Sequence, residues 1–160
     1  MAIQVGEKMP GVTLQKMNRG QIEEVSTADL FSGRKVVLFA LPGAFTPSCS
    51  AKHLPGFIEK AGEIKAKGVD EIVCLSVNDV FVMGAWADTQ GAGDKVTLLA
   101  DGNCELSSAI GLEFDGSKFG MGTRSQRYAA IIEDGVVKHL AVEEPAQFKV
   151  SSAEAVLEAL

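Results

Sequence analysis

The sequence is poor in the residues that hold disulfide-rich and metal-binding proteins together. Its 160 residues include three cysteines and two histidines, with no Cys-x-x-Cys pair. This argues against a disulfide framework, a metal site of closely spaced ligands and a thiol–disulfide oxidoreductase with a paired active site. The first residues lack the basic stretch followed by an apolar stretch that marks a secretory signal. We therefore expect free thiols in a reducing compartment, the cytoplasm, and no bound metal.

The chain also lacks basic clusters and long apolar runs. A net charge of −6 and an isoelectric point near 4.9 give no support for binding to nucleic acid or to an anionic membrane. No apolar run approaches the roughly 20 residues that span a bilayer. Hydrophobic residues make up 46% and charged residues 22%, as in ordinary globular proteins. The length predicts one domain, residues 1–160, with a sizeable core.

Alternating strands and helices are predicted along most of the chain. Buried strands are expected in three continuous apolar runs, at 35–41, 70–79 and 95–101. Helices are expected where apolar residues recur with helical spacing, at 54–68, 80–90 and 150–160. Hairpins are expected around an Asn-Arg-Gly turn and an Asp-Gly turn, at 11–25 and 127–144. This order predicts an α/β fold with a central mixed β-sheet flanked by helices and an N-terminal β-hairpin.

Three local features modify this outline. Pro55 lies inside the helix expected at 54–68 and should kink it or divide it. Residues 26–33 are expected to form a single capped helical turn, and residues 104–112 a short helix. A glycine-rich loop is expected at 115–127; its residues 116–122 follow no strand in the manner of a phosphate-binding loop, so we expect an ordinary loop there.

The most distinctive stretch, PGAFTPSC at 42–49, follows the first apolar strand. Thr46 is a good N-cap residue and Pro47 suits the first helical position, so a helix is expected to begin here. Cys49 then lies in the first turn, near unpaired backbone N–H groups and the positive end of the helix dipole, which stabilise a thiolate. Such stabilisation matters because a free cysteine with a pKa of about 8.5 is only about 3% ionised at pH 7. We predict a reactive thiol; the alternative is a cysteine that only packs.

Cys104 also lies early in a predicted helix, but its charge environment is different. Asp101 and Glu105 are anionic and would oppose a thiolate there. Cys49 instead has neutral residues before it and Lys52 in the next turn. Cys49 is therefore the better nucleophile of the two.

The stretch PGAFTPSCSAKHLPGF, with flanking segments along nearly the whole chain, resembles the peroxiredoxins, in particular the type II or peroxiredoxin-five group. The Pro-x-x-x-Thr-x-x-Cys core of that family stands here as Pro42, Thr46 and Cys49. The resemblance implies a thioredoxin-like fold and a thiol-dependent peroxidase that reduces hydrogen peroxide and small alkyl hydroperoxides. It also implies a homodimer and no metal, haem, flavin or other cofactor.

The resemblance extends to the roles of individual residues. Cys49 resembles the peroxidatic cysteine, which attacks the peroxide and becomes a sulfenic acid. Thr46 resembles the residue that orients the peroxide oxygens, and Pro42 the residue that shields the intermediate from water. The family uses an arginine at the start of a late strand; Arg127 matches this place, and Arg124 is the second candidate. Such donors would stabilise the charge that spreads from sulfur over two oxygens in the transition state.

The sulfenic acid must be reduced before the next turnover. Cys74 lies where plant-type members of the group carry a second cysteine, which makes it a candidate resolving cysteine. A disulfide needs Cα atoms about 4.4–6.8 Å apart, a distance that a helix start and the middle of a neighbouring strand are expected to exceed without local unfolding. The alternative is an external thiol, from glutathione with glutaredoxin or from thioredoxin. Cys104 stands where close relatives are expected to have glycine, and we assign it no role.

Two questions stay open at this point. His53, four residues after Cys49, could raise the thiolate fraction when protonated, or could pack and hydrogen-bond in a supporting part, which we favour. A protein with an oxidisable Cys49 could also be a redox sensor or holdase that signals to a partner, with peroxide turnover incidental. Sustained turnover with a thiol reductant separates that alternative from a peroxidase.

Overall fold

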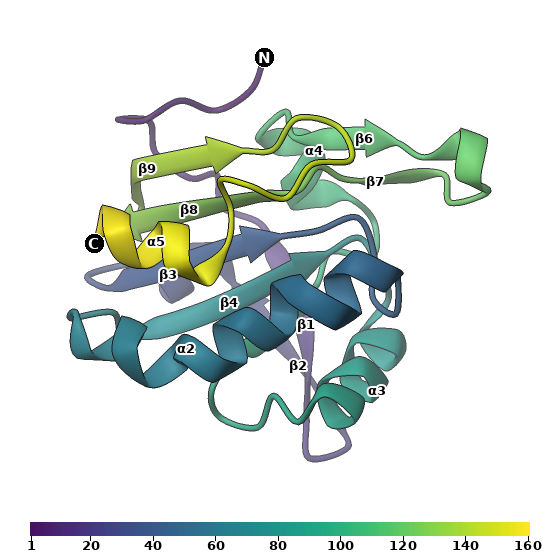
Figure 1. The fold of residues 1–160 in the computed structure, drawn as a ribbon, viewed down its shortest axis with the longest axis horizontal. Helices are drawn as coiled ribbons and strands as arrows, with labels where there is room; N and C mark the ends of the chain where they lie inside the picture. Colours follow the sequence, from purple (N-terminus) through teal and green to yellow (C-terminus); the bar gives the residue numbers. More distant parts are fainter.

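The computed structural model describes residues 1–160 and places a β-sheet between two layers of helices (Figure 1). The strands are β1 (Thr13–Asn18), β2 (Gln21–Ser26), β3 (Lys35–Ala40), β4 (Glu71–Ser76), β5 (Thr97–Ala100), β6 (Glu113–Asp115), β7 (Thr123–Ser125), β8 (Tyr128–Glu133) and β9 (Val136–Val142). The α-helices are α1 (Thr27–Phe31), α2 (Leu54–Ala66), α3 (Val80–Gln90), α4 (Glu105–Ala109) and α5 (Ala153–Ala159). Two short turns have other helical geometry, the π-helical η1 (Cys49–His53) and the 3-10 helix η2 (Ser117–Phe119).

Seven strands form the main sheet in the order β2-β1-β5-β4-β3-β8-β9. β4 runs parallel to both β3 and β5, and every other neighbouring pair is antiparallel. The N-terminal hairpin β1–β2 forms one edge of this sheet, and the hairpin β8–β9 forms the other. A mixed sheet with helices on both faces and a hairpin at the N-terminus confirms the predicted α/β fold.

Side chains of the central strands alternate between two cores, as the pleat of a sheet requires. From β3, Val37 and Phe39 point to the face covered by α2, α3 and α5. Val36 and Leu38 point to the opposite face, covered by α1 and α4. Strands β3 and β4 are buried on both faces, which explains why the sequence shows them as continuous apolar runs.

Two local predictions are wrong in part. The glycine-rich residues 116–122 do connect two strands as a loop, but the loop expected at 115–127 is too long, because β6 pairs antiparallel with β7 in a separate two-stranded sheet. These strands are three residues long and largely exposed, so the sequence carries no apolar alternation that would mark them. The turn at 26–33 is helical, but the Ser26 side chain makes no capping bond. The neighbouring Thr27 hydroxyl instead donates to the Pro10 carbonyl oxygen (2.8 Å).

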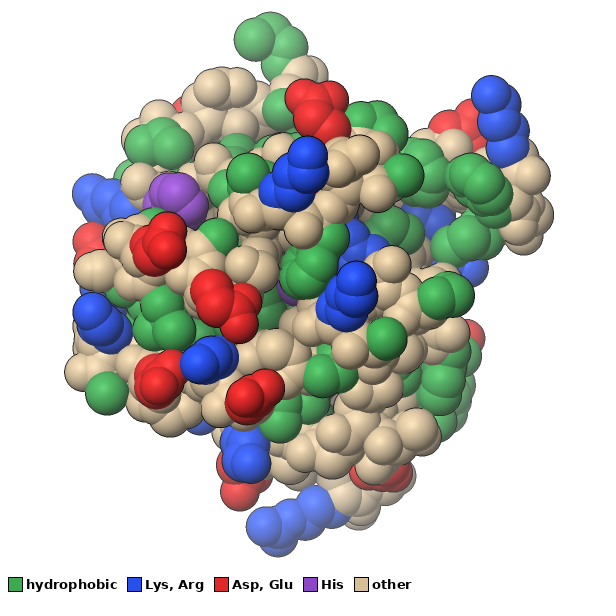
Figure 2. All heavy atoms as spheres, in the orientation of Figure 1, with side chains coloured by type: hydrophobic (Ala, Val, Ile, Leu, Met, Phe, Trp, Pro, Cys, Tyr) green, Lys and Arg blue, Asp and Glu red, His purple; other side chains and the backbone are tan.

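The surface carries charges of both signs without a basic patch on the face seen in Figure 2, where acidic and basic side chains are interspersed. No helix combines the length and the apolar character needed to cross a membrane. The electropositive stripe that nucleic-acid binding needs is thus missing from this face.

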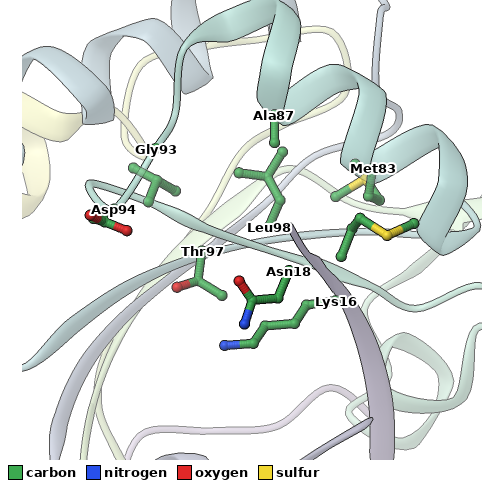
Figure 3. A pocket seen from close by; sticks show the side chains of 11 residues that line it. Lys16, Asn18, Met83, Ala87, Gly93, Asp94, Thr97 and Leu98 are labelled. Atoms are coloured by element: carbon green, nitrogen blue, oxygen red, sulfur yellow. The ribbon is translucent and has the colours of Figure 1, made fainter. Parts of the chain in front are cut away.

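Helix α3 packs closely across β1. The ladder between β1 and β5 has one paired position, Gln15 with Ala100, and a groove of about 330 Å³ opens between these strands and α3 (Figure 3). Gly84 of α3 lies so near to Met17 of β1 that a Cβ added at Gly84 would stand 2.9 Å from the Met17 Cβ. Because the backbone fixes the Met17 Cβ, only glycine fits at this position of α3.

We expect Gly84→Ala to lower the free energy of unfolding. The added methyl group would overpack against the Met17 Cβ, which no side-chain rotation can move away, so we expect a cost in the upper part of the usual range of about 1–3 kcal/mol. That cost is larger than the gain of about 1 kcal/mol that alanine brings to a helix. Gly62→Ala in α2 is the control, because no atom lies within 4 Å of its Cβ position, and this variant should be stabilised. Urea unfolding measures both variants, and equal stabilisation of the two would contradict the close packing.

Candidate active site

The pairing of β3 with β8 brings together segments that are far apart in the sequence. Ala40, at the end of β3, pairs with Tyr128, at the start of β8. The chain that leaves β3 therefore passes through Pro42 and reaches Cys49 beside Arg127, the residue that precedes β8. The parallel strands β3 and β4 both have their carboxyl ends near this point, and α/β proteins commonly place their sites at such an edge.

The helix begins where the sequence predicts, but the threonine hydroxyl has a different partner. The backbone N–H of Ser50 donates to the Thr46 carbonyl oxygen (3.0 Å), as expected for a residue at the helix start. The Thr46 hydroxyl donates to the Gly43 carbonyl oxygen (2.6 Å) and accepts no N–H of the first turn. The prediction that this hydroxyl caps the helix is therefore wrong, because the turn at 42–45 places the Gly43 carbonyl within its reach.

The first full turn after this start is a π-helix rather than an α-helix. The Leu54 N–H donates to the Cys49 carbonyl oxygen, five residues back. Pro55 lies in the first turn of α2, where its missing N–H is tolerated, and α2 continues unbroken to Ala66, so the prediction that the proline divides the helix at 54–68 is wrong. Residues four apart in a helical turn lie on the same face of the helix. Cys49 and His53 accordingly both face the interior and are buried.

The sulfur of Cys49 has a single charged partner, the guanidinium of Arg127. Nη2 of Arg127 donates to Cys49 Sγ over 3.1 Å, and Nη1 of the same group lies 2.8 Å from His53 Nδ1. Cys49 itself is completely buried. A buried thiolate needs such a charge-assisted hydrogen bond, because no water is there to solvate it.

His53 is a neutral acceptor for Arg127. Its Nε2 lies 2.9 Å from the Ser151 carbonyl oxygen, which can only accept, so Nε2 carries the hydrogen and Nδ1 accepts from Arg127. Burial, and then the Arg127 charge, lower the pKa of His53 to about 3. Of the two alternatives left open by the sequence, the geometry therefore supports the packing and hydrogen-bonding part, because a neutral ring adds no charge beside the thiol.

Arg124 lies near the same loop but contacts other groups. Its Nε donates to the Met121 carbonyl oxygen (2.9 Å), and its Nη1 donates to the Val77 carbonyl oxygen (3.2 Å). A Cβ added at Gly43 would stand 3.2 Å from this Nη1, so Arg124 presses against the turn that precedes Thr46. Of the two candidate arginines, Arg127 is the one that reaches Cys49.

The two other cysteines lie in environments unlike that of Cys49. Cys74 is fully buried in β4, opposite Phe39 in the ladder with β3. Burial, and then the neighbouring Cys49, raise the pKa of the Cys74 thiol well above its usual value, which keeps it protonated and weakly nucleophilic. Cys104 has a left-handed backbone (φ +59°), the conformation in which glycine is favoured, and this gives a physical reason for the glycine expected in relatives.

A cleft of about 790 Å³ opens beside the thiol, and Pro42, Thr46 and Arg127 are among the residues that line it. Phe148 also lines the cleft and packs against His53, with ring centroids 5.0 Å apart. The structure contains no group of three or more His, Cys, Asp or Glu side chains that could hold a metal ion.

The sequence reasoning missed the contribution of residues 143–151 to this site. Phe148, Ser151 and Glu143 all take part, and none belongs to a motif or to a regular element. Ser151 contacts His53 across 98 residues of sequence, so no local spacing marks that pair. The donors to the Glu143 carboxylate are only six to eight residues away, but they belong to no regular element, so no periodicity marks them. The one available signal is the Glu-Glu-Pro sequence after β9, which marks a turn and nothing more.

We expect the His53 imidazole to remain neutral from pH 8 to pH 5, with the proton on Nε2. Nitrogen–proton correlation spectra of a His139→Gln variant, which retains His53 as its one histidine, measure both properties; a midpoint near pH 6.5 would contradict the assignment. The unfolded chain binds this proton below about pH 6.5, and the folded protein only near pH 3. With respect to His53, the free energy of unfolding is therefore at its full value above pH 6.5 and decreases as the pH falls from 6.5 to 3, because protons then bind the unfolded chain more strongly.

Comparisons with known proteins agree with this arrangement. The Redoxin family model matches residues 4–157. Peroxiredoxin-2E-2, chloroplastic, from Oryza sativa subsp. japonica is 57% identical, over 99% of this chain and 72% of its own length. Peroxiredoxin-2B from Arabidopsis thaliana is 48% identical, over 99% of this chain and 98% of its own.

Solved structures give the same result. The crystal structure of reduced Prx3 from Vibrio vulnificus in complex with hydrogen peroxide is 50% identical to this chain. It superposes with a TM-score of 0.94 over 98% of each chain. The chain therefore belongs to the peroxiredoxins, in their type II (peroxiredoxin-five) group, and is a thiol peroxidase with a thioredoxin-like fold.

Proposed function

We propose that residues 1–160 act as one peroxiredoxin domain in which Cys49 is the peroxidatic cysteine. The observation that carries this proposal is the 3.1 Å contact between the buried Cys49 sulfur and the Arg127 guanidinium, next to the cleft. The substrates are hydrogen peroxide and small alkyl hydroperoxides. A cleft of about 790 Å³ is much larger than hydrogen peroxide requires, which supports the inclusion of the alkyl compounds.

The reaction transfers one oxygen atom from the peroxide to sulfur. The Cys49 thiolate attacks one peroxide oxygen, the S–O bond forms as the O–O bond breaks, and the electron pair leaves with the second oxygen. That oxygen takes up a proton to give water or an alcohol, and Cys49 becomes a sulfenic acid. Negative charge spreads from sulfur over both oxygens in the transition state, where the Arg127 N–H groups are already in place to stabilise it.

Thr46 and Pro42 act on the peroxide rather than on the sulfur. The Thr46 hydroxyl donates its one hydrogen to the Gly43 carbonyl oxygen, so its lone pairs are free to accept a hydrogen bond from the O–H group of a peroxide. This hydrogen bond would orient the substrate relative to Cys49. Pro42 lines the same cleft without an N–H group of its own, which suits it to shielding the sulfenic acid from water.

We propose that an external thiol, from glutathione with glutaredoxin or from thioredoxin, recycles Cys49. Its thiolate attacks the sulfenic sulfur and displaces hydroxide, which leaves as water after protonation, and a second thiol then reduces the mixed disulfide. Two observations support this over resolution by Cys74. That thiol is completely buried in β4, and burial raises its pKa, so it contains little of the thiolate that disulfide exchange requires.

The homodimer and the cytoplasmic location are further parts of the proposal. Three large apolar side chains, Phe45, Phe81 and Phe119, are 52–72% exposed, and Figure 2 shows apolar side chains gathered along the side formed by α3 and the β6–β7 hairpin. A second copy of the chain could cover them. All three cysteines are free, which supports a reducing compartment. The rice relative is named as chloroplastic, so direct localisation of this protein decides between the two compartments.

We expect Cys49→Ser to abolish peroxide consumption with every reductant, because it removes the attacking sulfur. Cys74→Ser and Cys104→Ser should keep turnover with glutathione plus glutaredoxin or with thioredoxin, measured by coupled oxidation of NADPH. Persistent turnover by Cys49→Ser would overturn the assignment. Loss of all turnover by Cys74→Ser would show that the chain resolves itself. One oxidation of Cys49 without sustained turnover would favour the redox sensor.

A further inference from the structure

One buried carboxylate holds the segment that follows β9. Glu143 is 7% exposed and accepts five hydrogen bonds from three consecutive residues. The Lys149 N–H donates to both carboxylate oxygens (2.9 and 2.8 Å), and the N–H groups of Val150 and Ser151 donate to Oε2 (2.8 and 2.9 Å). The Ser151 hydroxyl donates to the same oxygen over 2.7 Å. These successive donors form a concave anion site, which Glu143 fills from within the chain.

The same segment supports the ring of His53. Ser151 binds Glu143 with its N–H and its hydroxyl, and its carbonyl oxygen accepts the Nε2 hydrogen of His53. His53 in turn accepts from Arg127, whose other nitrogen donates to Cys49. An unbroken series of hydrogen bonds therefore connects the Glu143 carboxylate to the reacting sulfur.

Two further contacts tie this segment to Arg127. The Glu143 backbone N–H donates to the Arg127 carbonyl oxygen (2.9 Å). The guanidinium of Arg127 lies over the Phe148 ring, 5.7 Å from its centroid, at the distance of a cation–π contact. We call the five hydrogen bonds from residues 149–151 to the Glu143 carboxylate the clasp. The clasp holds the segment that contacts the Arg127 guanidinium through Phe148 and supports His53 through Ser151.

We infer that Glu143 is a positioning residue, which directs Arg127 toward Cys49 through Ser151 and His53. This inference rests on the proposed function of Cys49 and Arg127. An arginine side chain is long and has several donors, so a neighbour must hold its planar group in the one orientation that serves the transition state. Displacement of a catalytic group by about 1 Å can cost on the order of 100-fold in rate. Loss of the clasp would let the His53 ring move, and the Arg127 N–H groups would then no longer be held toward Cys49.

The ionisation state of Glu143 is consistent with its role as a positioning residue. Burial alone would raise the pKa of this carboxyl, but hydrogen bonds from Lys149, Ser151 and Val150 outweigh burial and lower the pKa. The carboxylate is therefore charged at neutral pH, as five accepted hydrogen bonds require.

A comparison of Glu143→Gln with Glu158→Gln tests the inference, because the same change at the exposed Glu158 of α5 leaves the clasp intact. Stopped-flow mixing with hydrogen peroxide measures the oxidation of Cys49. Trp86, the one tryptophan, donates to Ser50 Oγ (3.0 Å) in the first turn and reports the event by fluorescence. We expect Glu143→Gln to slow oxidation about 10- to 100-fold and Glu158→Gln to leave the rate unchanged.

Each variant is also made in the Arg127→Gln background. A residue that affects the oxidation rate only by positioning Arg127 can have no effect on that rate once the guanidinium is absent. There, Glu143→Gln should have no further effect. Ser151→Ala, which removes one of the five hydrogen bonds, should give a smaller loss of the same kind and replaces Glu143→Gln if that variant does not fold.

The inference is overturned if folded Glu143→Gln oxidises as fast as Glu158→Gln, or if its loss persists undiminished without Arg127, since either result leaves Glu143 a purely structural part. Wild-type protein whose Cys49 does not react with peroxide at all would instead refute the proposed function, so the two failures are distinct.

Discussion

The hydrogen bond from Arg127 to the buried sulfur of Cys49 is the contact on which the rest of this site depends. A thiolate out of reach of water is costly unless a fixed positive group compensates it. The sheet provides that group by pairing β3 with β8, so that the turn leaving one strand meets the residue preceding the other. The site thus follows from strand order, and neither segment could form it alone.

His53 is neutral because it is buried and contacts the same positive group, the Arg127 guanidinium, that compensates the thiolate. A protonated ring would place a buried positive charge in contact with the half-buried Arg127 guanidinium, so burial and the guanidinium together keep the imidazole uncharged. Its role then becomes geometric: it accepts from Arg127 on one nitrogen and donates to Ser151 on the other. The helical spacing makes this possible, because residues four apart lie on one face and Cys49 and His53 are both buried. The Arg127 guanidinium contacts both the Cys49 sulfur and the His53 imidazole. The segment after β9 holds the guanidinium and the imidazole in orientation through Ser151 and Phe148.

Most of the fold could be predicted from local sequence, and only part of the site. The apolar run of β3 and the Asp134–Gly135 turn, where both residues adopt left-handed backbone, carry signals within a few residues. The helix start at Thr46 and Pro47 is equally local. The state of His53 depends on the Ser151 carbonyl, 98 residues away, which no spacing reveals. The partner of the Thr46 hydroxyl, the Gly43 carbonyl, is only three residues back, but that contact depends on the backbone conformation of the turn between them. The donors to Glu143 lie only six to eight residues away, but residues 143–151 form no regular element, so no periodicity in the sequence marks these hydrogen bonds.

In the proposed reaction Arg127, rather than any nearby positive charge, makes Cys49 react with peroxide. The decisive measurement is the rate constant for oxidation of Cys49 by hydrogen peroxide in Arg127→Gln, compared with Arg124→Gln. Both changes remove one arginine near residues 42–49, since Arg124 lies against Gly43, but only Arg127 donates to the sulfur. We predict a loss of about 100- to 1000-fold for Arg127→Gln, the usual effect of deleting a transition-state donor, and a much smaller loss for Arg124→Gln. Equal losses in the two variants, or a fast Arg127→Gln, would contradict this account.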